Sequence, residues 1–251
     1  MALKTSTVVF PLAFACSFGT ALRAENAPLN QQQAVSEPFA DPIFESVCHL
    51  KIRRRVALFF HSTYTGSAVL YRGRYLLTAG HNVYQDRSAI ASIEVRCGSA
   101  NARKAPIDEK VEAWQTIDAS GYAGSPFSRD FGVIRLDNEI VVSRPIQLSS
   151  SLLEDNIDIQ FAGYPGGPHD GWSLFAATGK VTSQAFGVAK YDIETFKSNS
   201  GGPVWRNTID GPELVAIHVT NSGGRIVDGD FRQEVARLIS ELDRRFEQRG
   251  Q

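Results

Sequence analysis

A glycine-rich turn runs directly into an apolar strand at Ser198-Asn199-Ser200-Gly201-Gly202-Pro203-Val204. Glycines let another backbone approach closely, so this turn suits a nucleophilic hydroxyl with a backbone N–H beside it. A structural loop of the same composition is the alternative. The turn makes a testable demand on the rest of the sequence, because a nucleophilic serine requires a base and an orienting acid elsewhere in the chain.

Two other segments can supply those partners. Leu76 to His81 is an apolar strand that ends in small residues and then presents a histidine, a base suited to proton transfer near neutral pH. Asp130 stands at the entrance of an alternating strand, where a carboxylate can orient an imidazole. Taken singly, each residue is more often structural: a surface or core histidine in the first case, and a strand-capping aspartate in the second. The order His, Asp, Ser is that of chymotrypsin and differs from subtilisin and α/β-hydrolases. Together the segments predict a catalytic triad of His81, Asp130 and Ser200.

Short β-type runs separated by turn residues fill most of the chain, which predicts an all-β barrel or sandwich. The predicted strands are Val56 to Phe60, Ser67 to Tyr71, Tyr75 to Thr78, Ile93 to Cys97, Phe131 to Leu136, Ile157 to Phe161, Gly179 to Thr182 and Leu214 to Val219. One helix closes the chain, because Asp230 and Gln233 resemble a capping box and six apolar residues from Phe231 to Phe246 share one face. We expect that face to dock on a barrel.

The composition is that of an ordinary globular protein: 251 residues, 43% hydrophobic, 21% charged, with a formal net charge of −1. Lys and Arg are scattered, so we expect no nucleic-acid partner. The one basic run, Arg53-Arg54-Arg55, is interpreted as a solvated strand end or a proteolytic site. The sequence does not specify an oligomeric state.

Residues 1–24 have the features of a signal peptide, with one lysine, an apolar run and a small residue before the cleavage point. The run is too short to span a membrane, so we expect a secreted or periplasmic protein; a lipoprotein signal at Cys16 is the alternative. Residues 25–47 are polar and proline-punctuated, as in a propeptide or an N-terminal arm. Export leaves Cys48 and Cys97, which form either a disulfide or two separate buried thiols.

From about Ser67 to Phe246 the chain resembles the glutamyl endopeptidase, or V8-like, branch of the trypsin-like serine peptidases. Besides the three motifs, the resemblance rests on Gly163 to Gly166, Tyr191 to Thr195 and Ala216 to His218. The absence of a cysteine directly after His81 also fits this branch better than the animal trypsins. The resemblance implies two antiparallel six-stranded β-barrels of the chymotrypsin type, residues 48–140 and 141–251, the second with the terminal helix. The triad would meet between them, act on polypeptide substrates and need no cofactor.

The resemblance also assigns roles in substrate binding. The backbone N–H groups of Ser198 and Ser200 would form the oxyanion hole. Thr195 and His218 stand where the branch binds an acidic P1 side chain, and Lys197 would add positive potential; His218 as an ordinary core histidine is the alternative. Glu194, if it pointed into the pocket, would instead favour Lys or Arg.

Two positions depart from the expected pattern. Relatives usually carry glycine where Ser198 stands, and a positive φ is strained for serine. Either the loop tolerates the strain or its peptide is flipped at rest, so a weakly active or inactive partner-binding protein stays an alternative. Asn199 replaces the aspartate that pairs with a new N-terminal amine in trypsins, so we expect maturation without that ion pair. His49, His61 and His169 lack metal-ligand spacing, and no metal site is expected.

Overall fold

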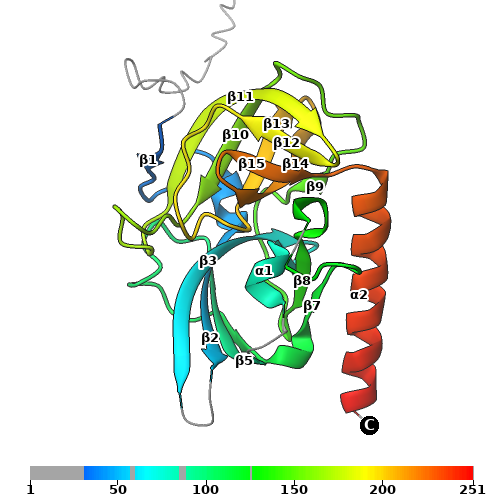
Figure 1. Ribbon diagram of the computed structural model, residues 1–251. Helices are drawn as coiled ribbons and strands as arrows, with labels where there is room; N and C mark the ends of the chain where they lie inside the picture. The colour runs from blue at the N-terminus through cyan, green and yellow to red at the C-terminus, as the bar shows by residue number, and fades with distance from the viewer. Residues whose placement is uncertain (1–30, 57–59, 85–88, 125, 251) are drawn as a thin grey trace, which may run out of the picture.

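The computed structural model describes residues 31–56, 60–84, 89–124 and 126–250. Figure 1 shows two β-sheets, one above the other, with a long C-terminal helix alongside. The elements in this part of the chain are β1 (Gln33–Ala34), η1 (Pro42–Ser46), β2 (Val47–Arg55), β3 (His61–Tyr71), β4 (Tyr75–Thr78), α1 (Gly80–Val83), β5 (Ala89–Cys97), β6 (Glu109–Val111), η2 (Ala113–Gln115), β7 (Thr116–Asp118), η3 (Phe127–Arg129), β8 (Gly132–Arg135), β9 (Gln147–Leu148), β10 (Asp158–Gly163), β11 (Phe175–Ala185), β12 (Val188–Tyr191), β13 (Pro203–Thr208), β14 (Gly211–Thr220), β15 (Gly223–Ile226) and α2 (Gly229–Arg249).

The C-terminal half is a closed antiparallel barrel. Its strands follow the order β11-β10-β13-β14-β15-β12, and β12 pairs back onto β11. The barrel therefore has six strands, as predicted. Two short strands add to it from outside: β1 pairs with β11, and β9 runs parallel to β14.

The N-terminal half is a curved antiparallel sheet in the order β6-β5-β2-β3-β4-β8-β7. Its end strands, β6 and β7, do not pair with each other within the described residues, so this half is a half-barrel of seven strands rather than the closed barrel of six that we expected. Both end strands have only three residues, and the chain passes from one to the other through η2 instead of forming a ladder. The all-β, chymotrypsin-like architecture is nevertheless as predicted.

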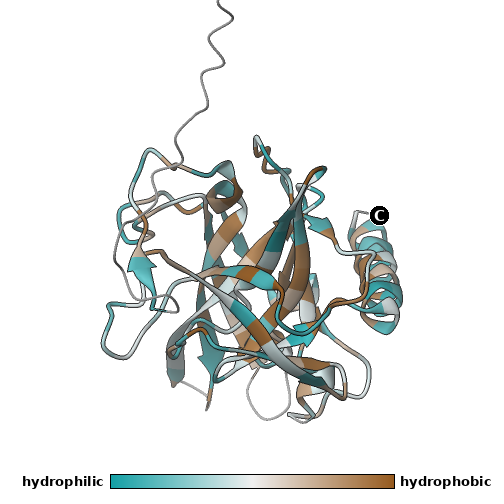
Figure 2. Ribbon diagram, turned by 90° about the horizontal axis from the view of Figure 1, so that it is seen from above, coloured by the Kyte–Doolittle hydropathy of each residue, from teal (hydrophilic) through white to brown (hydrophobic). Residues whose placement is uncertain are grey.

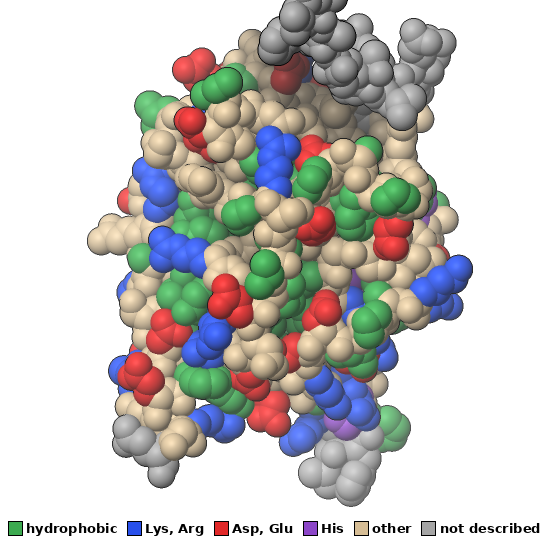
Figure 3. Space-filling model, turned by 180° about the vertical axis from the view of Figure 1, so that it is seen from behind, with side chains coloured by type: hydrophobic (Ala, Val, Ile, Leu, Met, Phe, Trp, Pro, Cys, Tyr) green, Lys and Arg blue, Asp and Glu red, His purple; other side chains and the backbone are tan. Residues whose placement is uncertain are grey.

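The described residues form three hydrophobic cores, and alternating side chains on one strand can serve two of them. On β13, Val204 points into the C-terminal barrel with Phe161 and Val215, whereas its neighbour Trp205 points into the core between the two halves. Successive strand residues face opposite ways, so one strand can serve both cores. Figure 2 shows the apolar strands gathered in the interior and polar segments around them, while Figure 3 shows acidic and basic side chains interspersed on the face behind.

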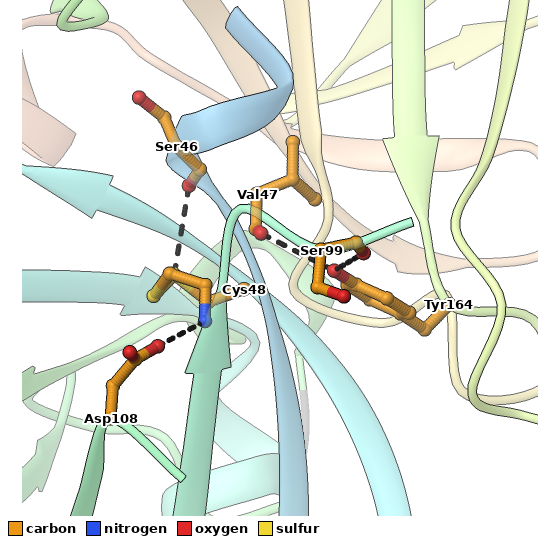
Figure 4. The surroundings of a disulfide bond; sticks show 7 residues. Ser46, Val47, Cys48, Ser99, Asp108 and Tyr164 are labelled. Atoms are coloured by element: carbon orange, nitrogen blue, oxygen red, sulfur yellow. Dashed lines mark hydrogen bonds between the residues drawn. A yellow bond between two sulfur atoms is a disulfide. The ribbon is translucent and has the colours of Figure 1, made fainter. Parts of the chain in front are cut away.

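A disulfide and a buried tyrosine lie where the two halves meet. Cys48 on β2 is bonded to Cys97, its direct partner on β5, which confirms the disulfide alternative. Nearby, the hydroxyl of the fully buried Tyr164 donates to the carbonyl oxygen of Ser99 at 2.7 Å (Figure 4). Tyr164 follows β10 of the barrel, so this bond ties the C-terminal half to the N-terminal half.

The described part of the predicted arm packs on the body of the molecule. The carboxylate of Asp41 accepts a hydrogen bond from Ile43 N–H at 3.0 Å and caps η1. Ile43 is fully buried, and the ring of Phe44 meets Trp205 edge to face at 6.2 Å. The predicted signal peptide, residues 1–24, lies outside the described residues. In the part of the chain that is described, no helix is both long and apolar enough to cross a bilayer.

The C-terminal helix α2 lies along β7 and β8 of the N-terminal sheet (Figure 1). Its predicted apolar face is confirmed, since Phe231, Val235, Leu238 and Leu242 are buried. The predicted cap is wrong by two residues. Asp228, not Asp230, is the N-cap, and its carboxylate accepts from Phe231 N–H at 2.8 Å.

One predicted strand, Val56 to Phe60, lies between β2 and β3 in the sequence. Val56 and Phe60 belong to neither strand, and Val56 N–H donates to Phe60 C=O at 2.9 Å; residues 57–59 lie outside the described residues. The strand actually present, β2, ends with Arg55. An unbroken apolar run of five residues carries no alternation, so it could not fix where a strand begins or ends.

Candidate active site

His81 is gripped at two points by one carboxylate. His81 lies on the single-turn helix α1, and Asp130 follows η3. Asp130 Oδ1 accepts from the His81 backbone N–H at 2.8 Å, while Asp130 Oδ2 lies 2.8 Å from His81 Nδ1. A Cβ on Gly80 would stand 2.9 Å from the backbone nitrogen of Phe131, so the glycine before the histidine permits this close approach. The ring orientation is thereby fixed, and Nε2 is left for a second partner.

The two members of this pair differ in exposure. Asp130 is 2% exposed, whereas the side chain of His81 is 37% exposed. Burial and the neighbouring Asp130 carboxylate raise the pKa of Tyr122, which keeps its phenol neutral. A buried carboxylate behind an accessible imidazole is the arrangement in which the acid orients and the histidine exchanges protons with a reactant.

The serine turn is pressed against strand β3 of the opposite half. Ser200 C=O accepts from Ser67 N–H at 2.9 Å, and Gly201 N–H donates to His218 C=O at 2.8 Å. Gly201 has φ +91°, and a Cβ there would lie 1.9 Å from the Ser67 carbonyl oxygen. Only glycine fits this position. Gly201 therefore allows the turn to pack against β3 of the other half.

Ser200 and His81 are brought to the same part of the seam. Asn82, directly after the histidine, donates its side-chain N–H to Ser200 C=O at 3.0 Å. Between the Ser200 hydroxyl and the His81 ring, both described, no hydrogen bond is formed. Catalytic hydrogen bonds of this type commonly tighten only when substrate binds.

Ser198 adopts the strained conformation that its position demands. Its φ is +69°, and two hydroxyls from β3 support it: Thr65 Oγ1 donates to Ser198 Oγ at 2.9 Å, and Ser67 Oγ donates to Ser198 C=O at 3.0 Å. The preceding carbonyl, of Lys197, accepts from Gly166 N–H at 2.7 Å. Within the described residues, the N–H groups of Ser198 and Ser200 donate to no protein acceptor.

His218 is almost completely buried, with 2% exposure. Its Nδ1 is hydrogen-bonded to the hydroxyl of Tyr191, and Phe161 meets its ring at 5.3 Å. Burial, together with the positive charges of His81 and Lys190, lowers the pKa of His218 to about 3. At neutral pH the ring is therefore uncharged and can donate through one nitrogen only.

The other predicted pocket residues are placed differently from one another. Thr195 is half-buried, and its Oγ1 accepts from Ser222 N–H at 3.0 Å. Lys197 and Glu194 are both exposed, and neither forms an ion pair with another described residue. Thr195 is thus held against the turn between β14 and β15, whereas the two charges stand at the surface.

Asn199 points inward. It is fully buried, and neither side-chain amide atom has a hydrogen-bond partner among the described residues. Its Oδ1 lies 3.0 Å from the position that a Cβ on Gly163 would take.

The described residues also contain no group of three His, Cys, Asp or Glu side chains arranged to hold a metal ion.

Sequence reasoning missed four supporting residues: Arg54, Thr65, Ser67 and Tyr191. The interpretation of the whole basic run as solvated is wrong at its centre, because Arg54 is only 8% exposed. Strand alternation was the available signal, since Arg54 is two residues from the buried Ile52 and shares its face. No comparable signal singles out Thr65 and Ser67, whose hydroxyls act on a loop some 130 positions away.

Comparisons with known proteins bear on the family and the fold. The trypsin family matches residues 49–238, more than half of the chain. A search of curated proteins found no match. Among solved structures, a Glu endopeptidase in complex with MPD superimposes with a TM-score of 0.60 at 23% identity, over 82% of this chain and 95% of that one; this likeness shows the fold. The chain belongs to the trypsin family of serine peptidases.

Proposed function

We propose that the protein is a serine endopeptidase whose triad is His81, Asp130 and Ser200. Ser200 Oγ attacks the scissile carbonyl while His81 Nε2 takes its proton and later gives it to the leaving amine. Asp130 holds the imidazole through Nδ1 and stabilises its charged form. The grip of one buried carboxylate on both the backbone and the ring of His81 carries this proposal, because it leaves the histidine one free, accessible nitrogen.

The oxyanion hole is assigned to the backbone N–H groups of Ser198 and Ser200. Their lack of protein acceptors supports the assignment, as does the positive φ of Ser198. Such preorganised donors stabilise the tetrahedral intermediate more than the substrate carbonyl, and one donor is worth about 10²–10³ in kcat.

For specificity we propose cleavage after Glu, and less well after Asp. Thr195 and the neutral His218 would donate hydrogen bonds to the substrate carboxylate, with Lys197 adding positive potential at the surface. The Tyr191 hydroxyl on His218 Nδ1 supports this, because it leaves Nε2 as the donor when the tyrosine donates. Cleavage after Lys or Arg is the second candidate, favoured by the carboxylate of Glu194 if it turns inward.

An inactive partner-binding protein on the same scaffold is the third candidate. The positive φ of the non-glycine residue Ser198 favours it, and the hydroxyls of Thr65 and Ser67 weaken it because they support the conformation that an oxyanion hole needs. We also propose export to an oxidising compartment, supported by the Cys48–Cys97 disulfide.

Digestion of a peptide library by the purified protein tests activity and specificity together. We expect cuts mainly after Glu, with turnover reduced about 10⁴-fold or more in Ser200→Ala. Cuts mainly after Lys or Arg would overturn the acidic specificity while leaving the triad standing. Equal digestion by the Ser200→Ala variant would overturn the triad.

A further inference from the structure

Helix α1, which carries His81, is hydrogen-bonded at its C-terminal end to one arginine of β2. The guanidinium of Arg54, on β2, reaches three backbone carbonyls at the end of α1. Nη2 donates to His81 C=O at 3.0 Å and to Asn82 C=O at 3.2 Å, and Nη1 donates to Tyr84 C=O. Nε donates to the hydroxyl of Tyr64 on β3. One buried side chain thus ties α1 to two strands of the N-terminal sheet.

A helix of one turn needs such an external partner. Within α1 and its caps, Asn82 N–H donates to Ala79 C=O at 3.1 Å and Tyr84 N–H donates to Gly80 C=O at 2.7 Å. The last carbonyls of any helix have no partner in the helix itself, and a cation close to them is favoured by their partial negative charge. Arg54 supplies the donors and the charge to the carbonyls that α1 cannot satisfy.

The position of α1 decides whether the reacting groups line up. Its first residues meet Asp130, and its second-last residue, Asn82, meets both Thr78 Oγ1 and Ser200 C=O, each at 3.0 Å. The described disulfide joins β2 to β5, so noncovalent bonds alone hold the helix between the acid and the serine turn. Loss of the hydrogen bonds from Arg54 would let the His81 imidazole move relative to Asp130 and to the serine turn.

We propose that Arg54 is a positioning residue for the peptidase reaction, acting through the backbone of α1 to hold His81 in register with Asp130 and Ser200. The inference rests on the proposed function. The bonds of Arg54 to α1 go to backbone carbonyls, so we expect it to affect the alignment of the base rather than substrate binding. Displacements of about 1 Å in a catalytic group lower rates by about 10²-fold.

The neighbouring arginines provide matched controls. Arg53 and Arg55 lie on the same strand and carry the same charge, but their side chains are exposed. Arg54→Met should lower kcat by about 10- to 100-fold with KM changed less than about twofold, whereas Arg53→Met should leave both near wild type. Arg54→Lys should recover part of the loss, since an ammonium has donors but lacks the fork that spans three carbonyls.

A second readout does not depend on turnover. The proton between His81 Nδ1 and Asp130 should give a low-field NMR signal in the wild type and in Arg53→Met, and this signal should broaden or vanish in Arg54→Met. Arg54→Lys keeps the measurement available if the methionine variant fails to fold. If the wild type cleaves no peptide, the proposed function fails. The NMR signal then decides by itself whether Arg54 positions His81. An unchanged kcat and an unchanged His81 signal in the folded Arg54 variants would overturn the proposal.

Discussion

Hydroxyl groups of β3 hold Ser198 in a conformation that serine avoids. A positive φ costs a non-glycine residue about 1–2 kcal/mol, and the bonds from Thr65 and Ser67 offset that cost. Ser67 is fully buried, and its hydroxyl also accepts from Tyr164 N–H at 2.9 Å. It therefore links the serine turn to the segment that follows β10.

We expect Ser67→Ala to lower both stability and activity. The variant leaves the Ser198 carbonyl and the Tyr164 N–H unpaired in the interior, at a cost of about 1–3 kcal/mol. A loosened Ser198 would lower kcat by up to about 10²-fold. Urea denaturation and steady-state kinetics measure the two effects. An activity loss no larger than the fraction unfolded would contradict the role assigned to Ser198.

A second prediction concerns His218. Tyr191→Phe removes the hydroxyl bound to Nδ1, so the tautomer that presents Nε2–H is no longer favoured. We expect kcat/KM for Glu substrates to fall about tenfold, the value of one hydrogen bond, with substrates of neutral P1 residue unchanged. A parallel fall for both substrate types would show that the tyrosine supports the barrel rather than the specificity of the pocket.

The residues of the proposed triad carry a clearer signal in the sequence than the residues that support them. The motifs around His81, Asp130 and Ser200 carry small residues and glycines at positions where the structure shows close approaches. Arg54 and Ser67 have no such local signature. Their partners come from distant segments, and only the assembled fold defines them.

At the scale of elements, the start of α2 shows how a local pattern can mislead. Asp230 fits the sequence rule for a capping box, but Asp228 makes the cap and also pairs with Arg225 at 2.8 and 2.9 Å. The side chain of Arg225 is 5% exposed and stacks near Phe131 and Phe231. Tertiary packing of this arginine fixes the first turn of the helix two residues earlier than the pattern indicates.

Substitutions at the two aspartates separate these alternatives. Asp228→Ala should destabilise the protein by about 2–4 kcal/mol, because it removes the cap and leaves a buried guanidinium without its carboxylate. Asp230→Ala, at an exposed position, should change stability by less than about 0.5 kcal/mol. Thermal and urea denaturation of both variants provide the comparison. Equal losses would restore the cap predicted from the pattern.

Strand prediction succeeded where apolar and polar residues alternate and failed where charge or an unbroken apolar run hid the pattern. Ile157 to Phe161 alternates in this way, and the observed strand β10 begins one residue later, at Asp158. The long strand β2 was missed because its end carries three arginines, although every second residue there faces inward. The alternation in such a strand can be recognised only if arginine is accepted as a residue at an inward-facing position.

For the whole molecule, two buried histidines link stability to pH. His49 on β2 is fully buried and stacks on Trp172 at 4.5 Å; burial, then the charge of Arg96, lowers its pKa from 6.5 to about 4. Burial likewise lowers the pKa of His218 to about 3. Both rings stay neutral in the folded protein while the unfolded chain takes up protons, so stability is full above pH 6.5 and is lost as the pH falls towards the folded pKa values.

We expect each histidine to remove about 1.4 kcal/mol of unfolding free energy per pH unit below 6.5. Carboxylates with lowered pKa, such as Glu234, add their loss only below about 4.5, which leaves a window for the histidines. His49→Phe keeps an aromatic ring on Trp172 and should roughly halve the slope in this window. Urea denaturation across the window measures it, and an unchanged slope would contradict the burial of His49 as a neutral ring.

We propose that a serine from the C-terminal barrel and a histidine–aspartate pair from the N-terminal half converge into one reactive site. Labelling with a fluorophosphonate, followed by intact mass measurement and peptide mapping, tests it most directly. We predict one adduct per molecule on Ser200, absent in Ser200→Ala and strongly slowed in His81→Ala. A correctly folded wild-type protein that gains no adduct, or gains it on another residue, would contradict the assignment.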